Sequence, residues 1–242
     1  MKKTMQVMMA ILLLLSAYIV MADPEGGTVT FVTNSTKSVT PATYRDDPKG
    51  TITTITINSV QQNTKWKAYI GNVTGTLVLR DADDYSIYEW SAIASPNGEV
   101  FITRNSTVDW STTQCANVTN IQTEQSKLGH GVSASDNIIN TFSSTIHQSF
   151  DVAGLTISNG TCRSAFTWIN NTAQTPSQNA KFQEVLLMDS SYRIVYSTII
   201  SQNTGGYRNA SGVNDRSDFQ AILPDYTSVS VARYYFYVEI DG

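Results

Sequence analysis

Short stretches of alternating polar and apolar residues, separated by turn residues, run through most of this 242-residue chain. Residues 28–33 alternate Thr with Val and Phe, and residues 51–57 alternate Thr with Ile. Residues 85–90 and 99–103 continue the pattern on either side of the turn sequence Pro96-Asn97-Gly98. Because successive side chains of a strand point to opposite faces, this period of two is typical of half-buried strands. The spacing predicts a mainly β fold, an antiparallel β-sandwich that is immunoglobulin-like or jelly-roll-like.

Further strands are predicted along the rest of the chain, at residues 66–70, 76–79, 146–157, 165–169, 184–188, 193–200 and 229–240. Asp189-Ser190-Ser191 is expected to form a hairpin turn between two of them. Residues 202–217 are rich in Gly, Asn and Ser without apolar periodicity, so a long loop is predicted there.

The middle of the chain, from residue 120 to 142, is polar and lacks strand alternation. Thr119 or Asn120 is expected to cap a short helix that runs to Leu128 and ends at Gly129. Ser135-Asp136 is expected to cap a second, with Ile138, Ile139 and Phe142 on one face. The sequence therefore predicts one or two short helices in a central insertion.

The first 22 residues have the pattern of a secretory signal peptide. Lys2 and Lys3 precede an uncharged apolar run that ends at Ala22, a small residue suited to cleavage, just before Asp23. A retained membrane anchor is the alternative, although the run is slightly shorter than the roughly 20 residues that a spanning helix needs. A retained pilin-type leader fits less well, because Lys3-Thr4 is not a small-residue processing site. We expect a secreted or cell-surface protein, which contacts the membrane only if the leader is retained.

Seven Asn-x-Ser/Thr triplets lie downstream of this leader, at Asn34, Asn72, Asn105, Asn117, Asn159, Asn170 and Asn209. None has Pro in the middle position. About four would arise by chance in a chain so rich in Asn, Ser and Thr, so the excess is modest. An exported chain with these acceptors is expected to carry N-linked glycans.

Cys115 and Cys162 are the only cysteines of the sequence. In an exported chain a single pair most simply forms one disulfide. Closing a loop of nearly fifty residues restricts the unfolded chain and stabilises the fold by about 3–4 kcal/mol. A metal site would need further ligands, and His130 and His147 do not have zinc-site spacing.

No motif in the sequence indicates catalysis, and we expect no enzyme activity. The two histidines, His130 and His147, belong to no nucleophile-elbow sequence. The acidic groups at Asp81, Asp83 and Asp84 and at Asp215 and Asp218 are incomplete as Ca²⁺ sites, so solvated acidic turns are the favoured interpretation. We therefore expect no metal and no cofactor, with Ca²⁺ as a weak alternative. The net charge of −4 also argues against a nucleic-acid partner.

Four tryptophans, Trp66, Trp90, Trp110 and Trp168, are the candidates for a sugar-stacking platform. Aromatic residues at strand spacing more often pack in a core, and that is the favoured interpretation here.

The N-terminal segment predicts assembly. The candidate assembly strand consists of Thr28, Val29, Thr30, Phe31, Val32 and Thr33. It follows a Gly-rich lead and precedes a Ser/Thr/Pro-rich segment at residues 34–44, which is typical of a linker. A tethered strand can pair with a neighbouring copy as a donor strand, and the contact then propagates head to tail. The alternative is an ordinary first strand of the chain's own sandwich. We thus expect a leader (1–22), a strand and linker (23–44), and a sandwich domain (45–242), either single or built from two packed sub-domains.

Three stretches of the sequence, residues 66–75, 88–90 and 113–115, resemble uncharacterised exported surface proteins of small-genome archaea. The resemblance covers mainly residues 50–200. It implies a β-rich archaeal cell-surface glycoprotein and carries over no active-site residue. In broad design the chain is also similar to strand-exchanging extracellular fibre subunits, through the tethered N-terminal strand alone.

Two functional hypotheses follow from the sequence. In the first, the chain is a structural subunit of an extracellular, heavily N-glycosylated fibre or surface layer, whose partners are copies of itself. In the second, it is a monomeric secreted carbohydrate-binding or adhesion module, motivated by the four tryptophans.

Overall fold

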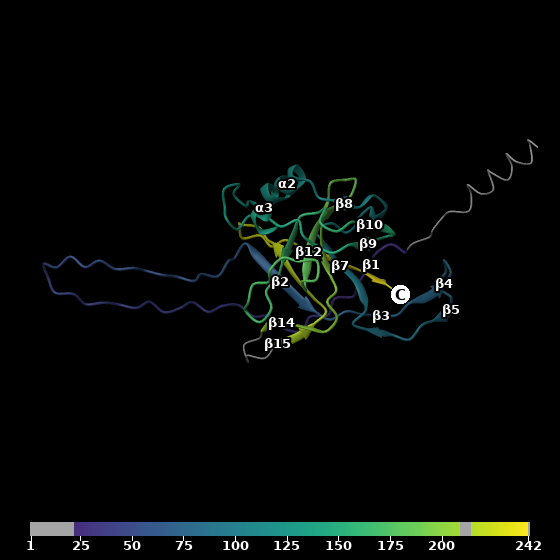
Figure 1. Ribbon diagram of the computed structural model, residues 1–242, viewed down its shortest axis with the longest axis horizontal. Helices are drawn as coiled ribbons and strands as arrows, with labels where there is room; N and C mark the ends of the chain where they lie inside the picture. Colours follow the sequence, from purple (N-terminus) through teal and green to yellow (C-terminus); the bar gives the residue numbers. More distant parts are fainter. Residues whose placement is uncertain (1–21, 209–213, 242) are drawn as a thin grey trace, which may run out of the picture.

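A central antiparallel sheet organises the residues that this computed structural model describes, 22–208 and 214–241 (Figure 1). Its strands follow the order β1 (Glu25–Gly26), β17 (Tyr235–Asp241), β7 (Asn97–Thr103), β13 (Ile194–Ile199), β12 (Gln183–Met188) and β11 (Ser164–Phe166). A further strand, β8 (Gln114–Cys115), also pairs with β12. The mainly β, antiparallel, sandwich-like fold predicted from the sequence is therefore confirmed.

The three central strands β7, β12 and β13 are buried on both faces of this sheet. Ile102, Leu186 and Tyr196 point into one apolar cluster. Phe101, with its neighbours on β12 and β13, points into the other. Strands covered on both sides need apolar residues at successive positions, which explains the uninterrupted apolar run at residues 185–188.

Different elements cover the two faces. The first face carries a two-stranded sheet, β2 (Trp66–Gly71) with β16 (Phe219–Pro224), and the helices α2 (Val118–Leu128) and α3 (Ile138–Thr141). The second face carries the 3-10 helix η1 (Trp110–Thr112) and the hairpin of β9 (Phe150–Val152) and β10 (Leu155–Ile157).

The two predicted helices are present, but their caps differ from the prediction. The side chain of Asn117 caps α2 by accepting a hydrogen bond from the Asn120 N–H at 2.9 Å. Asn137 caps α3 in the same way, through the Asn140 N–H at 2.8 Å. The predicted caps were wrong because neighbouring Thr, Asn, Ser and Asp residues are comparable cap formers, and tertiary packing selects among them. Gly129 ends α2 as expected, with a φ of 81° that favours glycine.

The predicted disulfide is confirmed. Cys115 and Cys162 are bonded, and the bridge joins β8 to the segment just before β11. The bond closes the central insertion that contains α2 and α3.

Five predicted elements were wrong in extent or type. The single strand predicted at 146–157 is the hairpin of β9 and β10. Residues 28–33 and 51–57 form no strand, because no strand of the described chain lies beside them to complete a ladder. The predicted loop at 202–217 contains a hairpin, β14 (Thr204–Arg208) with β15 (Asn214–Ser217). The last strand begins at Tyr235, six residues later than predicted, and Val229 and Val231 before it are exposed.

One long irregular hairpin projects from the body between β2 and β7. It contains β3 (Thr74–Gly75), β4 (Val78–Arg80), β5 (Ser86–Glu89) and β6 (Ile93–Ala94). We call residues 73–95 the distal hairpin, because β4 and β5 lie at the end of the molecule away from the long excursion on the left of Figure 1.

Candidate functional site

The most unusual feature of the molecule is a long exposed excursion between β1 and β2, residues 28–62, which we call the arm (Figure 1). A turn at Pro48, closed by hydrogen bonds from the N–H and the hydroxyl of Thr51, divides the arm into two limbs, residues 28–47 and 51–62. Gly50 adopts a φ of 82° in this turn, a conformation that glycine tolerates best. Lys37 of the first limb donates to the carbonyl of Val60 in the second at 2.8 Å, so the limbs run side by side.

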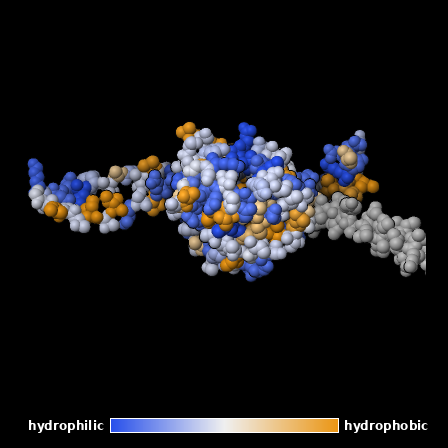
Figure 2. Space-filling view, turned by 90° about the horizontal axis from the view of Figure 1, so that it is seen from above, coloured by the Kyte–Doolittle hydropathy of each residue, from blue (hydrophilic) through white to orange (hydrophobic). Residues whose placement is uncertain are grey.

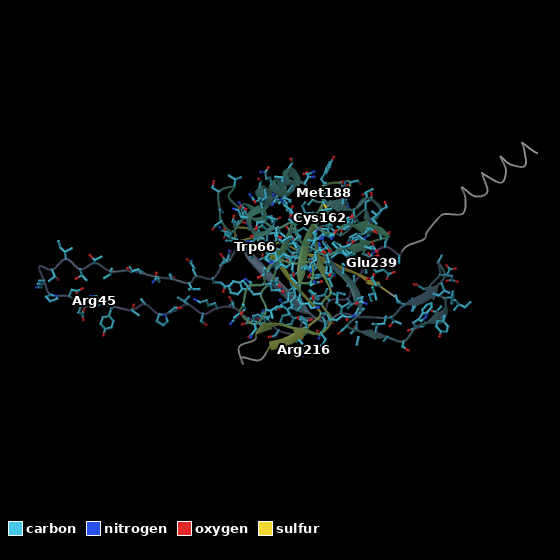
Figure 3. All side chains as sticks on the ribbon, viewed as in Figure 1. Arg45, Trp66, Cys162, Met188, Arg216 and Glu239 are labelled. Carbon is cyan, nitrogen blue, oxygen red and sulfur yellow. A yellow bond between two sulfur atoms is a disulfide. The ribbon has the colours of Figure 1, made fainter. Side chains whose placement is uncertain are left out.

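The arm exposes apolar side chains over its whole length. Nine large hydrophobic residues on it are each 60 % exposed or more: Val29, Phe31, Val32, Val39, Tyr44, Ile52, Ile55, Ile57 and Val60. Figure 2 shows these apolar residues distributed along the projection on the left, and Arg45 lies near its far end in Figure 3. A stretch of this kind marks an interaction surface, because leaving so much apolar area in water is unfavourable.

The central sheet is open where the arm leaves it. Of the residues that the structure describes, only Glu25 and Gly26 pair with the outer edge of β17, and Gly27 adds one hydrogen bond to the carbonyl of Phe236 at 3.1 Å. A groove of about 480 Å³ lies at this edge, lined by Gly26, Gly27, Val29, Ser106 and residues 234–237. The described part of the chain therefore covers only part of this seven-residue edge strand.

The two-stranded sheet of β2 and β16 has one edge whose backbone groups are hydrogen-bonded and one edge that is open. Side chains close the outer edge of β16: Thr198 donates to Gln220 O, and Glu184 accepts from the Ile222 N–H. Pro224 has no N–H, and its carbonyl accepts from the Tyr234 hydroxyl at 2.6 Å. On β2, by contrast, no described residue bonds the outward backbone groups of Ala68 or Ile70. Unpaired backbone along an edge favours pairing with another strand.

Four carboxyl groups gather where β7 and β17 meet the β9–β10 hairpin. Glu99 lies opposite Glu239 in the ladder, and Asp151 and Asp241 are close enough to act on it. Glu99 is 3 % exposed, and burial, followed by the charges of Asp241, Glu239 and Asp151, raises its pKa to about 9. Glu239, labelled in Figure 3, accepts from the Ala153 N–H at 3.0 Å, and burial raises its pKa as well. No sequence signal pointed to this cluster, because Glu99 occupies the end of an ordinary alternating strand.

Most of the predicted glycan acceptors lie on the surface. Asn34, on the arm, and Asn72, Asn117, Asn159 and Asn170, on the body, are exposed. Asn105 is half-buried, and its amide donates to the Thr103 hydroxyl at 3.3 Å. Asn209 lies outside the described residues. The cap of α2 uses the side-chain oxygen of Asn117, so the amide nitrogen, to which a glycan would be attached, takes no part in the cap.

Both histidines are buried, and each forms hydrogen bonds to backbone groups. Nδ1 of His147 donates to Gln148 O at 2.7 Å, and its Nε2 accepts from the N–H groups of Thr161 and Cys162. Burial lowers the pKa of His147, which favours this neutral form. The ring therefore fixes the turn beside the disulfide. His130 bonds Asp225 O at 2.9 Å and packs edge-on against Trp66.

The acidic turns have structural roles. Asp81 accepts from the N–H groups of Asp83 and Tyr85, so it closes the tip of the distal hairpin. Asp218, which is 1 % exposed, accepts from the Val73 and Asn203 N–H groups. The structure does not describe the side chain of Asp215. Among residues 22–208 and 214–241, no three His, Cys, Asp or Glu side chains are grouped as metal ligands would be.

The four tryptophans do not share one environment. Trp110 is buried between Phe101 and Tyr237, and Trp66 is half-buried, with its indole N–H donating to Asp136 O. Trp90 and Trp168 are 48 % and 60 % exposed. The interpretation as packing residues therefore holds for two of the four.

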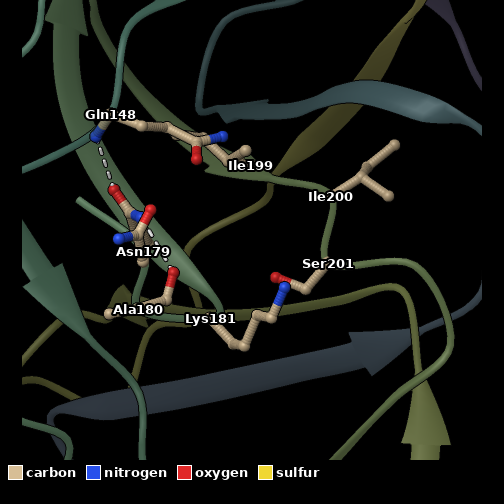
Figure 4. A pocket seen from close by; sticks show the side chains of 8 residues that line it. Gln148, Asn179, Ala180, Lys181, Ile199, Ile200 and Ser201 are labelled. Carbon is tan, nitrogen blue, oxygen red and sulfur yellow. Dashed lines mark hydrogen bonds between the residues drawn. The ribbon is translucent and has the colours of Figure 1, made fainter. Parts of the chain in front are cut away.

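A small polar cavity of about 170 Å³ lies beside β12 and β13 (Figure 4). Its lining includes Gln148, Asn179, Lys181 and Ser201. Gln183 crosses it, accepting from the Gln148 N–H and donating to Ala180 O, both at 2.8 Å. Gln183 therefore links the backbone at Gln148 to the loop at Ala180 beside this cavity.

Comparison with known proteins finds no matching family model, no matching curated protein and no matching solved structure. In the described part of the chain, no helix has the length and apolar character needed to cross a membrane. The arm, the open sheet edges and the exposed asparagines are therefore the features from which a function can be argued.

Proposed function

We propose that this protein is a structural subunit of an extracellular, N-glycosylated fibre or surface layer, in which copies are joined head to tail by β-strand exchange. The arm carries the proposal. It holds the strand-forming sequence of residues 28–33, and it exposes Val29, Phe31 and Val32, which pair with no strand of the described chain. A neighbouring copy supplies the missing ladder, and the alternation of side chains sets the register.

Open edges on the body support this assignment. Among the described residues, only Glu25, Gly26 and Gly27 bond the outer edge of β17, and none bonds the outward backbone of Ala68 or Ile70 on β2. Because donor and acceptor belong to different parts of the subunit, each copy both gives and receives a strand. Such a contact propagates unless the rotation between copies closes a ring.

The exposed acceptor asparagines support an extracellular, glycosylated subunit. Asn72, Asn159 and Asn170 lie on turns or loops of the body. Glycans at these positions are expected to shield the surrounding surface from unwanted pairing.

Deletion of residues 28–33 tests the proposal. The wild-type chain is expected to form polymers visible by electron microscopy, and the deletion is expected to leave a folded β-rich monomer. Deletion of residues 38–43 is the matched control, since it shortens the same limb equally and keeps the donor sequence. Polymers that persist without residues 28–33 contradict strand exchange through this segment.

A carbohydrate-binding module is the second candidate, and the exposed Tyr88–Trp90 pair favours it. The two rings meet edge to face at 5.0 Å. A glycan array with the wild-type chain and with Trp90→Ala tests it. Flat responses across the array contradict sugar binding, and a response that disappears in the variant supports it.

A further inference from the structure

The distal hairpin lies at the end of the molecule opposite the arm. Figure 1 places the arm on the left and β4 and β5 on the far right, and the view in Figure 2 preserves this arrangement. The base of the hairpin is fixed to the body, because the N–H of buried Val73 donates to Asp218 at 2.8 Å. From this base the hairpin extends away from the body, and within residues 22–208 and 214–241 the strands β4 and β5 pair only with each other.

One face of this hairpin is apolar. Leu79 pairs with Tyr88, and the Trp90 N–H donates to Leu77 O at 2.9 Å. Paired residues, and residues two apart on one strand, share a face, so these four side chains form one row. Leu79, Tyr88 and Trp90 are 55 %, 60 % and 48 % exposed. An isolated two-stranded hairpin is marginally stable in water, and a third strand is a usual remedy.

The charges of the arm and of the distal hairpin are complementary. The hairpin tip and its strands carry Asp81, Asp83, Asp84 and Glu89 against the single base Arg80. The arm carries three bases, Lys37, Arg45 and Lys49, against two acids. The net positive arm of one copy is therefore attracted to the net negative distal hairpin of the next.

The second limb of the arm fits this hairpin. Its residues 51–57 have the alternation of a strand, and Ile55 and Ile57 are two residues apart, as are Leu77 and Leu79. Both isoleucines are exposed, by 60 % and 83 %. A strand laid along the hairpin edge continues the apolar row with these two side chains.

We propose that the distal hairpin of one copy is the docking site for residues 51–57 of the arm of the next copy. The inference rests on the proposed strand-exchange function and names a partner surface for it. The arm then contributes two limbs to one contact: residues 28–33 as proposed above, and residues 51–57 at the distal hairpin.

Two variants and their mixture test this docking site. In the hairpin variant, Leu79, Tyr88 and Trp90 are replaced by Ser, and in the arm variant Ile55 and Ile57 are replaced by Ser. Ile87→Ser is the matched control, since Ile87 is 81 % exposed and adjacent to Tyr88, but has no cross-strand partner at the register shift of the hairpin. Size-exclusion chromatography with light scattering gives the mass of each species, and circular dichroism checks that each variant is folded.

We expect each of the two variants to need at least a tenfold higher concentration than wild type to assemble, and Ile87→Ser to assemble normally. At a concentration at which neither variant assembles alone, the one-to-one mixture is expected to form heterodimers. The intact arm of the hairpin variant then occupies the intact distal hairpin of the arm variant.

The outcomes separate the inference from the proposed function. A hairpin variant that polymerises as wild type does, while deletion of residues 28–33 still blocks assembly, overturns the docking site alone. A mixture that stays monomeric also overturns it. A wild-type chain that is monomeric at every concentration contradicts strand exchange itself.

Discussion

The buried carboxyl group of Glu99 makes the stability of this fold depend on pH in an uncommon direction. Its folded-state pKa of about 9 lies above the ordinary value of 4.5. The folded state therefore retains a proton that the unfolded chain releases between pH 4.5 and 9. The contribution of Glu99 to stability is complete below pH 4.5 and is lost as the pH rises through that range.

The size of the effect follows from the same shift. Each pKa unit corresponds to about 1.4 kcal/mol, so the free energy of unfolding falls by about 3 kcal/mol between pH 4.5 and pH 7 through Glu99 alone. Glu99→Gln keeps the shape and cannot ionise. Between those two pH values, the stability of the variant relative to wild type is expected to rise by about 3 kcal/mol.

Urea unfolding at pH 4.5, 5.5 and 7, followed by tryptophan fluorescence and circular dichroism, measures this difference. Glu89→Gln is the control, since Glu89 is an exposed glutamate on β5. Any cost of packing the introduced amide is common to all three pH values, so it cancels from the slope. Parallel stability curves for wild type and Glu99→Gln contradict a buried, neutral Glu99.

Three further predictions concern the fold. Phe101→Ala removes a fully buried ring that packs 5.2 Å from Trp110 and is expected to cost about 3–5 kcal/mol by urea unfolding, whereas Tyr85→Ala, at an exposed site, is expected to change stability by less than about 0.5 kcal/mol. Asn117→Ala removes the cap of α2 and is expected to cost about 1 kcal/mol, and Asn117→Asp is expected to retain most of it; equal losses contradict the cap. Reduction of Cys115–Cys162 is expected to lower the free energy of unfolding by about 3–4 kcal/mol, and unchanged melting in reductant contradicts that contribution.

The sequence predicted the interior of the fold well, for a physical reason. Strands that are covered on both faces need consecutive apolar or aromatic residues, and residues 185–188 and 194–196 have them. The disulfide could be predicted equally well, because one pair of cysteines allows a single pairing. In both cases the local sequence and the tertiary structure impose the same requirement.

The structure of the arm could not be predicted in this way. Residues 28–33 and 51–57 have the alternation of strands, yet they are exposed and unpaired. A period of two reports which faces a strand presents and not which edge it joins. Pairing is a long-range property, and here the partner that we propose is another chain.

Burial of Glu99 could not be predicted either. It arises because β7 lies between β13 and β17 while the β9–β10 hairpin covers the same face. Each of these contacts joins segments that are far apart in the sequence. A glutamate that begins a strand after a Pro-Asn-Gly turn has the pattern of a surface residue.

Electron microscopy of the assembled native protein tests the central claim most directly, because it shows subunit contacts and glycan density together. We expect filaments or sheets in which the arm of each subunit lies on the body of the next. Sugar density is expected at exposed asparagines such as Asn72 and Asn159. Separate monomers, or arms that fold back onto their own bodies, contradict assembly by strand exchange.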